Sequence, residues 1–206
     1  MTKLLTTDPQ RRDAILNAAL KEFLSQGYDN ASTNVIAKEA GISKALMFHY
    51  INSKQELFLF VYDYFTEILE TEYFGKMDLS QKDIFTRLRQ SYLLQIDLMK
   101  QYPWLFEFNK LSIVTNSDEV NNELEKRANK KQSSCGNKLF DTIDVSNFRA
   151  GLDIEKCKQF ILWSNIGFTS QILDDIKNSE SSNLNYEQIV STLDEYFAEL
   201  RKIFYT

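Results

Sequence analysis

Apolar residues recur every three or four positions along most of this 206-residue chain, and this spacing is the strongest constraint on its fold. No segment shows the alternation of apolar and polar residues that is typical of a half-buried strand. Asp8 followed by Pro9 is a typical helix start, and Gly27 ends the first apolar-periodic run. The sequence therefore predicts an all-α protein of about nine helices.

Two short helices and one long helix are predicted next. Ser32 or Thr33 caps a helix that Gly41 stops, and a third short helix spans about residues 43–50. Ser53 and Glu56 form a capping box that begins a long amphipathic helix reaching about residue 75.

The second half repeats this logic. Helices are expected from Ser80 to Gln101, from Pro103, after Ser117, after Asp153 and after Asn185. We therefore expect two domains, a small head over residues 1–54 and a larger helical bundle over residues 55–206.

Histidine and cysteine are scarce, which limits the possible chemistry. The chain has one histidine and two cysteines, Cys135 and Cys157, which are too few for a disulfide framework or a four-ligand zinc site. It has no glycine-rich phosphate loop and no GxSxG motif. We expect no enzyme activity, no metal and no cofactor.

The location and partners follow from apolar content and charge. No apolar run approaches the roughly 20 residues of a membrane span and no signal peptide is evident, so we expect a soluble cytoplasmic protein. The formal net charge is −5, but residues 1–54 hold seven basic and five acidic residues and so carry +2. This asymmetry predicts a mildly basic head on an acidic body.

The head has the pattern of a helix-turn-helix. Ala37 is small where two helices cross, Gly41 lies in the turn, and Ile42, Met47 and Tyr50 face inward. The remaining face of the third helix is suited to the DNA major groove. Lys54, at the start of the next helix, is placed to bind a phosphate.

Residues 10–57 resemble the TetR family of bacterial transcriptional regulators. The resemblance is carried by residues 33–37, by Gly41-Ile42-Ser43-Lys44, by His49-Tyr50, and by Ser53-Lys54 with Glu56-Leu57. It implies a homodimer that binds a near-palindromic operator in double-stranded DNA and releases it when a small-molecule effector enters the larger domain. The implied groove residues are Ser43, Lys44, Ala45, Leu46, Phe48, His49 and Tyr50, with Thr33 and Lys54 on phosphates.

This chain departs from the family at three groove positions. Ala45, Leu46 and Phe48 stand where the family often has Gly, Thr and Tyr, so two hydroxyls are missing. Leu46 is instead suited to a thymine methyl group, which indicates an altered operator sequence. Alternatives stay open: His49 as an ordinary surface residue, the lysines as a solvated face, and Phe48 in the core.

Aromatic residues are concentrated in the middle helices of the body. They pack a core or line a cavity for an apolar or aromatic effector, with amides as polar groups. The candidate effector-binding residues are Tyr62, Phe65, Tyr92, Gln95, Trp104, Phe108, Asn109 and Trp163.

The last two predicted helices are strongly apolar. We expect them to form a two-fold, four-helix dimer interface, with closure of the monomer core as the alternative. The candidate interface residues are Trp163, Ser164, Gly167, Phe168, Tyr196, Phe197 and Leu200. Competing functions are an all-α module that binds a partner protein through its acidic body, and a ligand-responsive activator.

Overall fold

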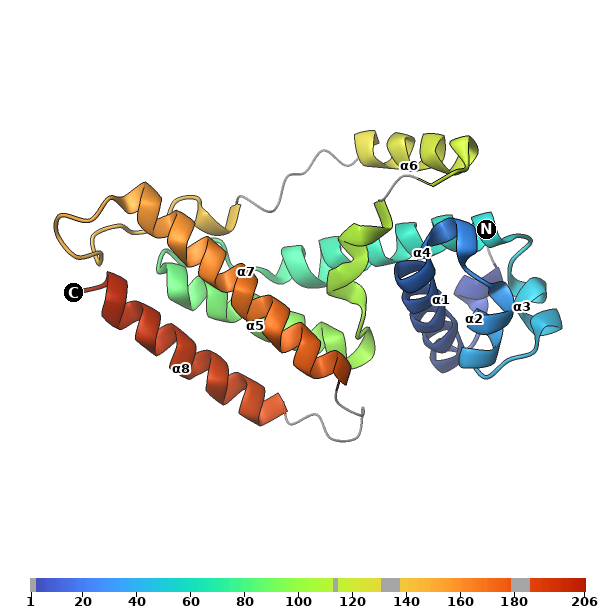
Figure 1. Cartoon of the computed structure of the whole chain (residues 1–206), viewed down its shortest axis with the longest axis horizontal. Coiled ribbons are helices and arrows are strands. Elements are labelled where there is room, and N and C mark those ends of the chain that lie inside the picture. Colours follow the sequence, from blue (N-terminus) through green and yellow to red (C-terminus); the bar gives the residue numbers. More distant parts are fainter. Residues whose placement is uncertain (1–2, 113–114, 131–137, 179–185) are drawn as a thin grey trace. The chain divides into compact units, whose positions relative to one another are not determined.

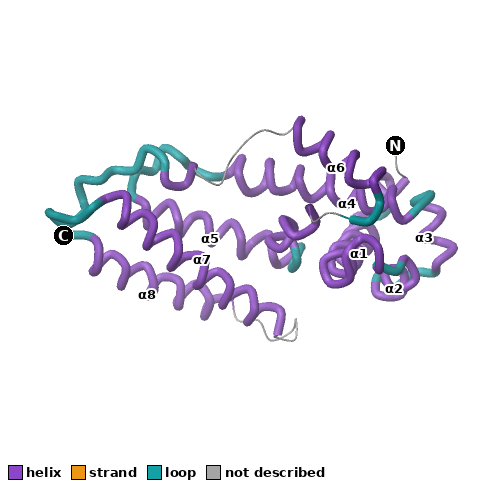
Figure 2. Tube along the Cα trace, turned by 45° about the horizontal axis from the view of Figure 1, so that its top comes forward, coloured by secondary structure: helices purple, strands orange, loops and turns teal. Residues whose placement is uncertain are grey.

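The computed structural model describes residues 3–112, 115–130, 138–178 and 186–206 (Figure 1). These residues form eight α-helices with short 3-10 and π segments, and Figure 2 shows no strand among them. The helices are α1 (Pro9–Asn30), α2 (Thr33–Glu39), α3 (Lys44–Tyr50), α4 (Lys54–Ile68), α5 (Ile84–Gln101), α6 (Asp118–Lys130), α7 (Ile154–Asn178) and α8 (Tyr186–Phe204). The all-α prediction is confirmed.

Most predicted helix starts are made by the side chains expected to cap them. Asp8 accepts a hydrogen bond from the backbone N–H of Arg11 at 3.0 Å, and Asp153 accepts one from that of Lys156 at 3.2 Å. At the start of α2, Ser32 makes no side-chain capping bond, so the cap predicted there is wrong. Ser43, which was not predicted as a cap, accepts a bond from the N–H of Leu46 at 3.1 Å. Ser53 and Glu56 complete the capping box, because the N–H of Glu56 donates to Ser53 and Glu56 accepts from the N–H of Asn52. Asn185, the predicted cap of the last helix, lies outside the described residues.

Three boundaries differ from the prediction. The helix expected to begin at Ser80 begins at Ile84, because Asp83 caps it by accepting from the N–H of Thr86 at 2.7 Å. The helix expected from Pro103 is a 3-10 segment, η4 (Leu105–Ser112). The long helix keeps regular α geometry only to Ile68 and continues as a π turn and a 3-10 turn to Lys76.

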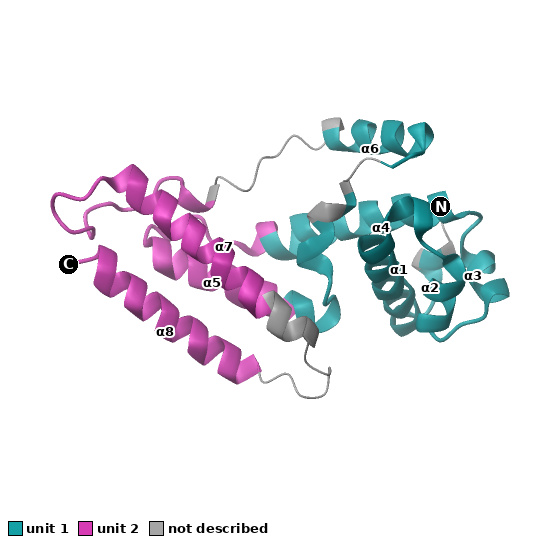
Figure 3. Cartoon of the chain, viewed as in Figure 1, with its two compact units in different colours: residues 1–73, 98–133 teal, residues 74–97, 134–206 magenta. Residues whose placement is uncertain are grey.

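Figure 3 shows two compact units. Unit 1 comprises residues 1–73 and 98–133, and unit 2 comprises residues 74–97 and 134–206. Helix α5 contributes residues to both. This division into compact units does not test the functional boundary expected after residue 54, which stays a prediction.

Unit 1 packs α1 to α4 around one apolar core. Ile36 of α2, Met47 of α3 and Leu57 of α4 are all fully buried in one cluster with Leu16 and Phe23 of α1. Helix α3 packs on α2 and on the 3-10 turn η1 (Lys3–Thr6), and its opposite face is exposed.

Unit 2 packs α7 and α8 side by side with the first part of α5 (Figures 1 and 2). Tyr92 and Phe197 are buried with ring centroids 5.8 Å apart. Arg87 is fully buried, and its guanidinium donates to the carbonyls of Leu79, Gln81, Leu139 and Asp141 at 2.7–3.1 Å. It therefore fixes the segment before α5 to residues 139–141. None of the helices in the described part of the chain combines the length and apolar character that a membrane crossing requires.

Candidate nucleic-acid interface

A tight turn between α2 and α3 sets the position of the recognition helix. The N–H of Gly41 donates to the carbonyl of Lys38 at 3.1 Å, and the N–H of Ile42 donates to that of Ala37 at 2.9 Å. This pair of bonds is a Schellman motif, which requires a left-handed residue, and Gly41 has φ of 69°. Glycine adopts that conformation without steric cost.

Helix α3 presents most of the predicted groove residues to solvent. Ser43, Lys44, Ala45, Phe48 and His49 are exposed. Leu46, Tyr50 and Thr33 are half-buried. Phe48 keeps 40% of its surface accessible, so it lies on the outer face and not in the core of the chain.

Lys44 and Phe48 form one patch on this face. The ammonium of Lys44 lies 6.0 Å from the ring centroid of Phe48, one turn further along the helix. The patch combines a positive charge with an apolar ring and so offers both a phosphate contact and an apolar contact. The ring of His49 meets that of Tyr50 edge-on, with centroids 5.6 Å apart.

Tyr50 is tied back to the N-terminal end of α1. Its hydroxyl accepts hydrogen bonds from Thr7 at 3.2 Å and from the guanidinium of Arg11 at 3.4 Å. The bond from Thr7, followed by that from Arg11, lowers the pKa of Tyr50. Sequence reasoning assigned no role to Arg11, which is exposed beside the end of α3 and adds a positive charge there. The sequence marks Arg11 only as one of the seven basic residues in residues 1–54.

Lys54 has a structural role that the sequence did not indicate. Its ammonium donates to the carbonyl of Asp29 at 2.9 Å and to that of Ala31 at 3.3 Å, and it lies 4.8 Å from the ring centroid of Tyr28. Lys54 thus caps the C-terminal end of α1. A lysine has three donors, and the described residues use two of them here.

The candidate effector residues are divided between the two units. In unit 1, Phe65 and Phe108 are buried, and Tyr62 lies 5.3 Å from Phe108 between ring centroids. Trp104 is half-buried in the same cluster. The side chain of Asn109 lies outside the described residues.

Three further candidates lie in unit 2. The hydroxyl of Tyr92 donates to the carbonyl of Asn165 at 3.0 Å, and the amide of Gln95 donates to Ser91 at 3.1 Å. Trp163 lies on the surface with 55% of its area accessible. Trp163 therefore belongs to the exposed face of α7.

The candidate dimer residues fall into exposed and buried groups. Trp163 and Gly167 are exposed, while Ser164 accepts a hydrogen bond from Tyr196 at 2.8 Å and is half-buried. Phe168 and Tyr196 stack with ring centroids 4.1 Å apart. Phe197 and Leu200 are buried within the core of unit 2. The burial of Phe197 and Leu200 agrees with the alternative, in which these residues close the core of the monomer.

The sequence of this head matches known regulators. Residues 15–66 match the model described as "Bacterial regulatory proteins, tetR family". The HTH-type transcriptional regulator BetI of Agrobacterium fabrum is 46% identical over 52 residues. The HTH-type transcriptional activator FasR of Mycolicibacterium smegmatis is 40% identical over 52 residues.

The fold of the whole chain also matches a solved regulator. The ketosteroid transcriptional regulator KstR2 of Mycobacterium tuberculosis aligns over 97% of this chain and 97% of its own, with a TM-score of 0.56 and 16% identity. Over residues 15–66 the chain is similar to bacterial regulatory proteins of the TetR family. The sequence matches span about a quarter of this chain and a quarter of the curated relatives, which are 25% and 24% covered. The matched residues 15–66 include the turn, α3 and most of α4, which are described above.

Proposed function

We propose that this chain is a TetR-like transcriptional regulator that binds operator DNA in the bacterial cytoplasm as a homodimer. The observation that carries the proposal is the exposed face of α3, which is held outward by the Gly41 turn and by the buried Met47. A short helix presented in this way fits the major groove, which is about 12 Å wide. In this proposal residues 1–54 bind DNA and residues 55–206 bind the effector and the second copy.

The proposed contacts are divided between bases and phosphates. The exposed residues of α3 read base edges, with Leu46 against a thymine methyl group. Thr33, Arg11 and the third donor of Lys54 bind phosphates, which fixes the helix in register. In the dimer, two such helices are about 34–36 Å apart and occupy successive major grooves.

Regulation follows from differential binding. A small apolar or aromatic effector lowers operator affinity when it binds more tightly to an arrangement of the two heads that does not fit the operator. The coupling free energy between effector and operator is about 1–3 kcal/mol. Helix α4 is the proposed lever, because it begins at the cap of α1 and carries Phe65 into the aromatic cluster. Repression is the proposed outcome. The alternative is activation. It is supported by the similarity to FasR, which is named as an activator and matches this chain over 52 residues, as BetI does.

Selection of duplexes from a random DNA pool by the purified full-length chain tests the proposal. We expect enrichment of a near-palindromic sequence, with affinity falling as salt rises at a log-log slope of about −0.9 per neutralised phosphate. Heparin is the control polyanion. Equal affinity for heparin and for every duplex at low ionic strength would contradict a sequence-specific regulator. It would instead favour the partner-binding module.

A further inference from the structure

The residues before α1 hold the C-terminal end of the recognition helix. The 3-10 turn η1 packs on α3, and Leu4 within it is fully buried in the same apolar cluster as Met47 of α3. This turn precedes residues 15–66, over which the chain matches known regulators. The match therefore says nothing about the role of the residues before α1.

Tyr50, the last residue of α3, joins that helix to the preceding segment through its hydroxyl. The hydroxyl of Thr7 donates to it at 3.2 Å, and Nη1 of Arg11 donates to it at 3.4 Å. Thr7 and Tyr50 are both half-buried, so water competes less for the bond between them than it would on an open surface. One anchor of Tyr50 thus lies before α1 and the other lies in its first turn.

The anchored side chain is coupled to the face of α3 that is proposed to read bases. Tyr50 follows Leu46 by four residues and Met47 by three, so it lies on the same side of the helix as both. A side chain held at this place resists rotation of α3 about its own axis. Because Leu46 is the proposed contact for a thymine methyl group, such a rotation would move it away from its base.

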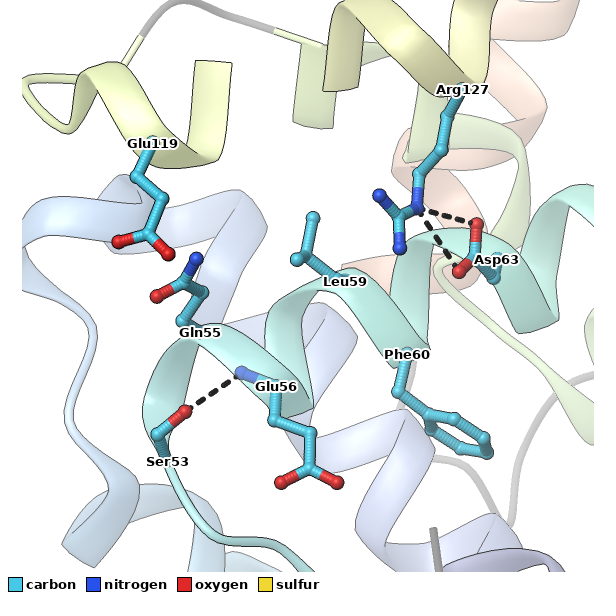
Figure 4. A pocket seen from close by; sticks show the side chains of 8 residues that line it. All are labelled: Ser53, Gln55, Glu56, Leu59, Phe60, Asp63, Glu119 and Arg127. Carbon is cyan, nitrogen blue, oxygen red and sulfur yellow. Dashed lines mark hydrogen bonds and ion pairs between the residues drawn. The ribbon is translucent and has the colours of Figure 1, made fainter. Parts of the chain in front are cut away.

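The backbone that follows Tyr50 is held separately by the capping box of α4. Figure 4 shows the bond from the N–H of Glu56 to the hydroxyl of Ser53, which is 3.0 Å long. Oε2 of Glu56 accepts from the backbone N–H of Asn52 at 2.7 Å, two residues after Tyr50. Because these bonds do not involve Thr7, removal of its hydroxyl tests the side-chain anchor and not the turn between α3 and α4.

We propose that Thr7 is a positioning residue for DNA recognition, an inference that rests on the proposed function. Its hydroxyl fixes Tyr50, and Tyr50 in turn fixes the rotation of α3 and the guanidinium of Arg11 beside the end of that helix. Thr7 acts through Tyr50 and does not itself contact DNA. Loss of the anchor lowers operator affinity, because the groove residues must then be ordered when DNA binds.

Operator affinity in four variants of the full-length chain tests this role. Thr7→Val keeps the shape of the side chain and removes its hydroxyl, so we expect affinity to fall about fivefold, the size of effect of one hydrogen bond. Tyr50→Phe removes both bonds and lowers affinity about tenfold. The double variant stays within about twofold of Tyr50→Phe, because Thr7 acts only through the Tyr50 hydroxyl. Thr7→Ser, which keeps a hydroxyl, stays within about twofold of the native chain. Fluorescence anisotropy on the operator selected by the native chain measures all four.

The pKa of Tyr50 gives a second readout that needs no DNA. The bond from Thr7, followed by that from Arg11, lowers this pKa below its ordinary value of about 10. NMR titration of the chain labelled at tyrosine Cζ measures it, with the Tyr50 resonance assigned by its absence in Tyr50→Phe. We expect Thr7→Val to raise the pKa, because the phenolate loses a donor. Thr71→Val is the matched control and leaves the pKa unchanged, since its exposed hydroxyl binds only the carbonyl of Glu67 among the described contacts.

The two readouts separate a failure of this inference from a failure of the proposed function. Native operator affinity in Thr7→Val, losses that multiply in the double variant, or no recovery in Thr7→Ser overturns the positioning role. An unchanged pKa of Tyr50 in Thr7→Val overturns the anchor itself, whether or not the chain binds DNA. If the native chain selects no operator while Thr7→Val raises the pKa of Tyr50, the proposed function fails and takes the role of Thr7 in recognition with it, although the anchor is present.

Discussion

At the scale of single residues, Lys54 illustrates how one side chain serves both folding and the proposed binding. Two of its donors hold the end of α1, and its ammonium lies 4.8 Å from the ring centroid of Tyr28. Lys54→Met retains the stem and removes the charge. We expect the free energy of unfolding to fall by about 1–2 kcal/mol, because two carbonyls at a helix end lose a charged donor.

The same variant tests the phosphate contact. If Lys54 also binds a phosphate, the log-log slope of DNA affinity against salt becomes shallower by about 0.9 in Lys54→Met. The measurement is fluorescence anisotropy on the selected operator at several salt concentrations. An unchanged slope together with lower stability would assign Lys54 to capping alone.

Leu46 tests base recognition at the same scale. Leu46→Thr restores the hydroxyl that the family often has at this position and removes apolar contact with a thymine methyl group. We expect the preference at one base pair of each half-site to change, by about 1–3 kcal/mol of discrimination. Repeating the random-pool selection with this variant measures the change. Identical selected sequences would show that Leu46 does not read a base.

At the scale of elements, the start of α5 depends on Asp83, which binds across unit 2. Its carboxylate accepts from Thr86 at 2.7 Å and from the guanidinium of Arg201 on α8, with one contact of 3.0 Å. Burial disfavours the charged form, but the hydrogen bonds from Arg201 and Thr86 outweigh it and lower the pKa of Asp83. The ionised carboxylate therefore joins α5 to α8.

This pKa direction predicts acid sensitivity. Because the folded pKa lies below the unfolded value of about 3.9, the stabilisation is fully present above that pH and is lost as pH falls toward the folded pKa. Asp83→Asn lowers the free energy of unfolding by about 1–3 kcal/mol at pH 7 and flattens its dependence on pH below about 4. Urea unfolding across this range measures both effects. Asp141→Asn, an exposed carboxylate of unit 2, is the control and keeps the native pH slope.

Elements set by neighbouring residues are predictable, whereas contacts between distant segments are not. The Gly41 turn and the caps at Asp8, Ser53 and Asp153 follow from groups three or four residues apart, and all four are present. The cap at Asp83 is also local, because Thr86 lies three residues away, but Ser80 was taken as an earlier helix start. The bond from Arg201 on α8 to Asp83 spans 118 positions, and local spacing does not predict it.

The candidate site divides in the same way. Exposure of Ala45 and His49 on α3 follows from helical spacing once Met47 is assigned to the core, because both lie two residues from Met47 on the opposite face. The capping role of Lys54 depends on carbonyls 25 and 23 positions earlier, to which a flexible side chain must turn. No periodicity within one helix encodes such a contact.

At the scale of the whole molecule, the exposed face of α7 is the strongest argument for a second copy. Phe160, Trp163 and Ile166 keep 52%, 55% and 56% of their surfaces accessible, and Gly167 beside them has no side chain to obstruct an approaching helix. Adjacent exposed apolar side chains of this size mark association surfaces. The proposed homodimer buries this face in both copies.

Trp163→Glu tests the dimer and its link to DNA binding together. A carboxylate in the middle of the buried face is desolvated without a partner, so we expect the variant to be monomeric at micromolar concentration by light scattering. Its affinity for a full operator then falls about a hundredfold or more, because binding of one head no longer holds a second head close to the other half-site. Its affinity for a single half-site stays within about twofold, because α3 is unchanged.

Val145→Glu is the matched control, since it adds the same charge at an apolar residue of unit 2 with 45% exposure that lies outside α7. A monomeric native chain would contradict the dimer directly. A dimeric Trp163→Glu variant with full operator affinity would remove α7 from the interface while leaving the DNA-binding proposal intact. Loss of half-site affinity in this variant would mean instead that the substitution damages the fold, because the heads bind single half-sites without help from the interface.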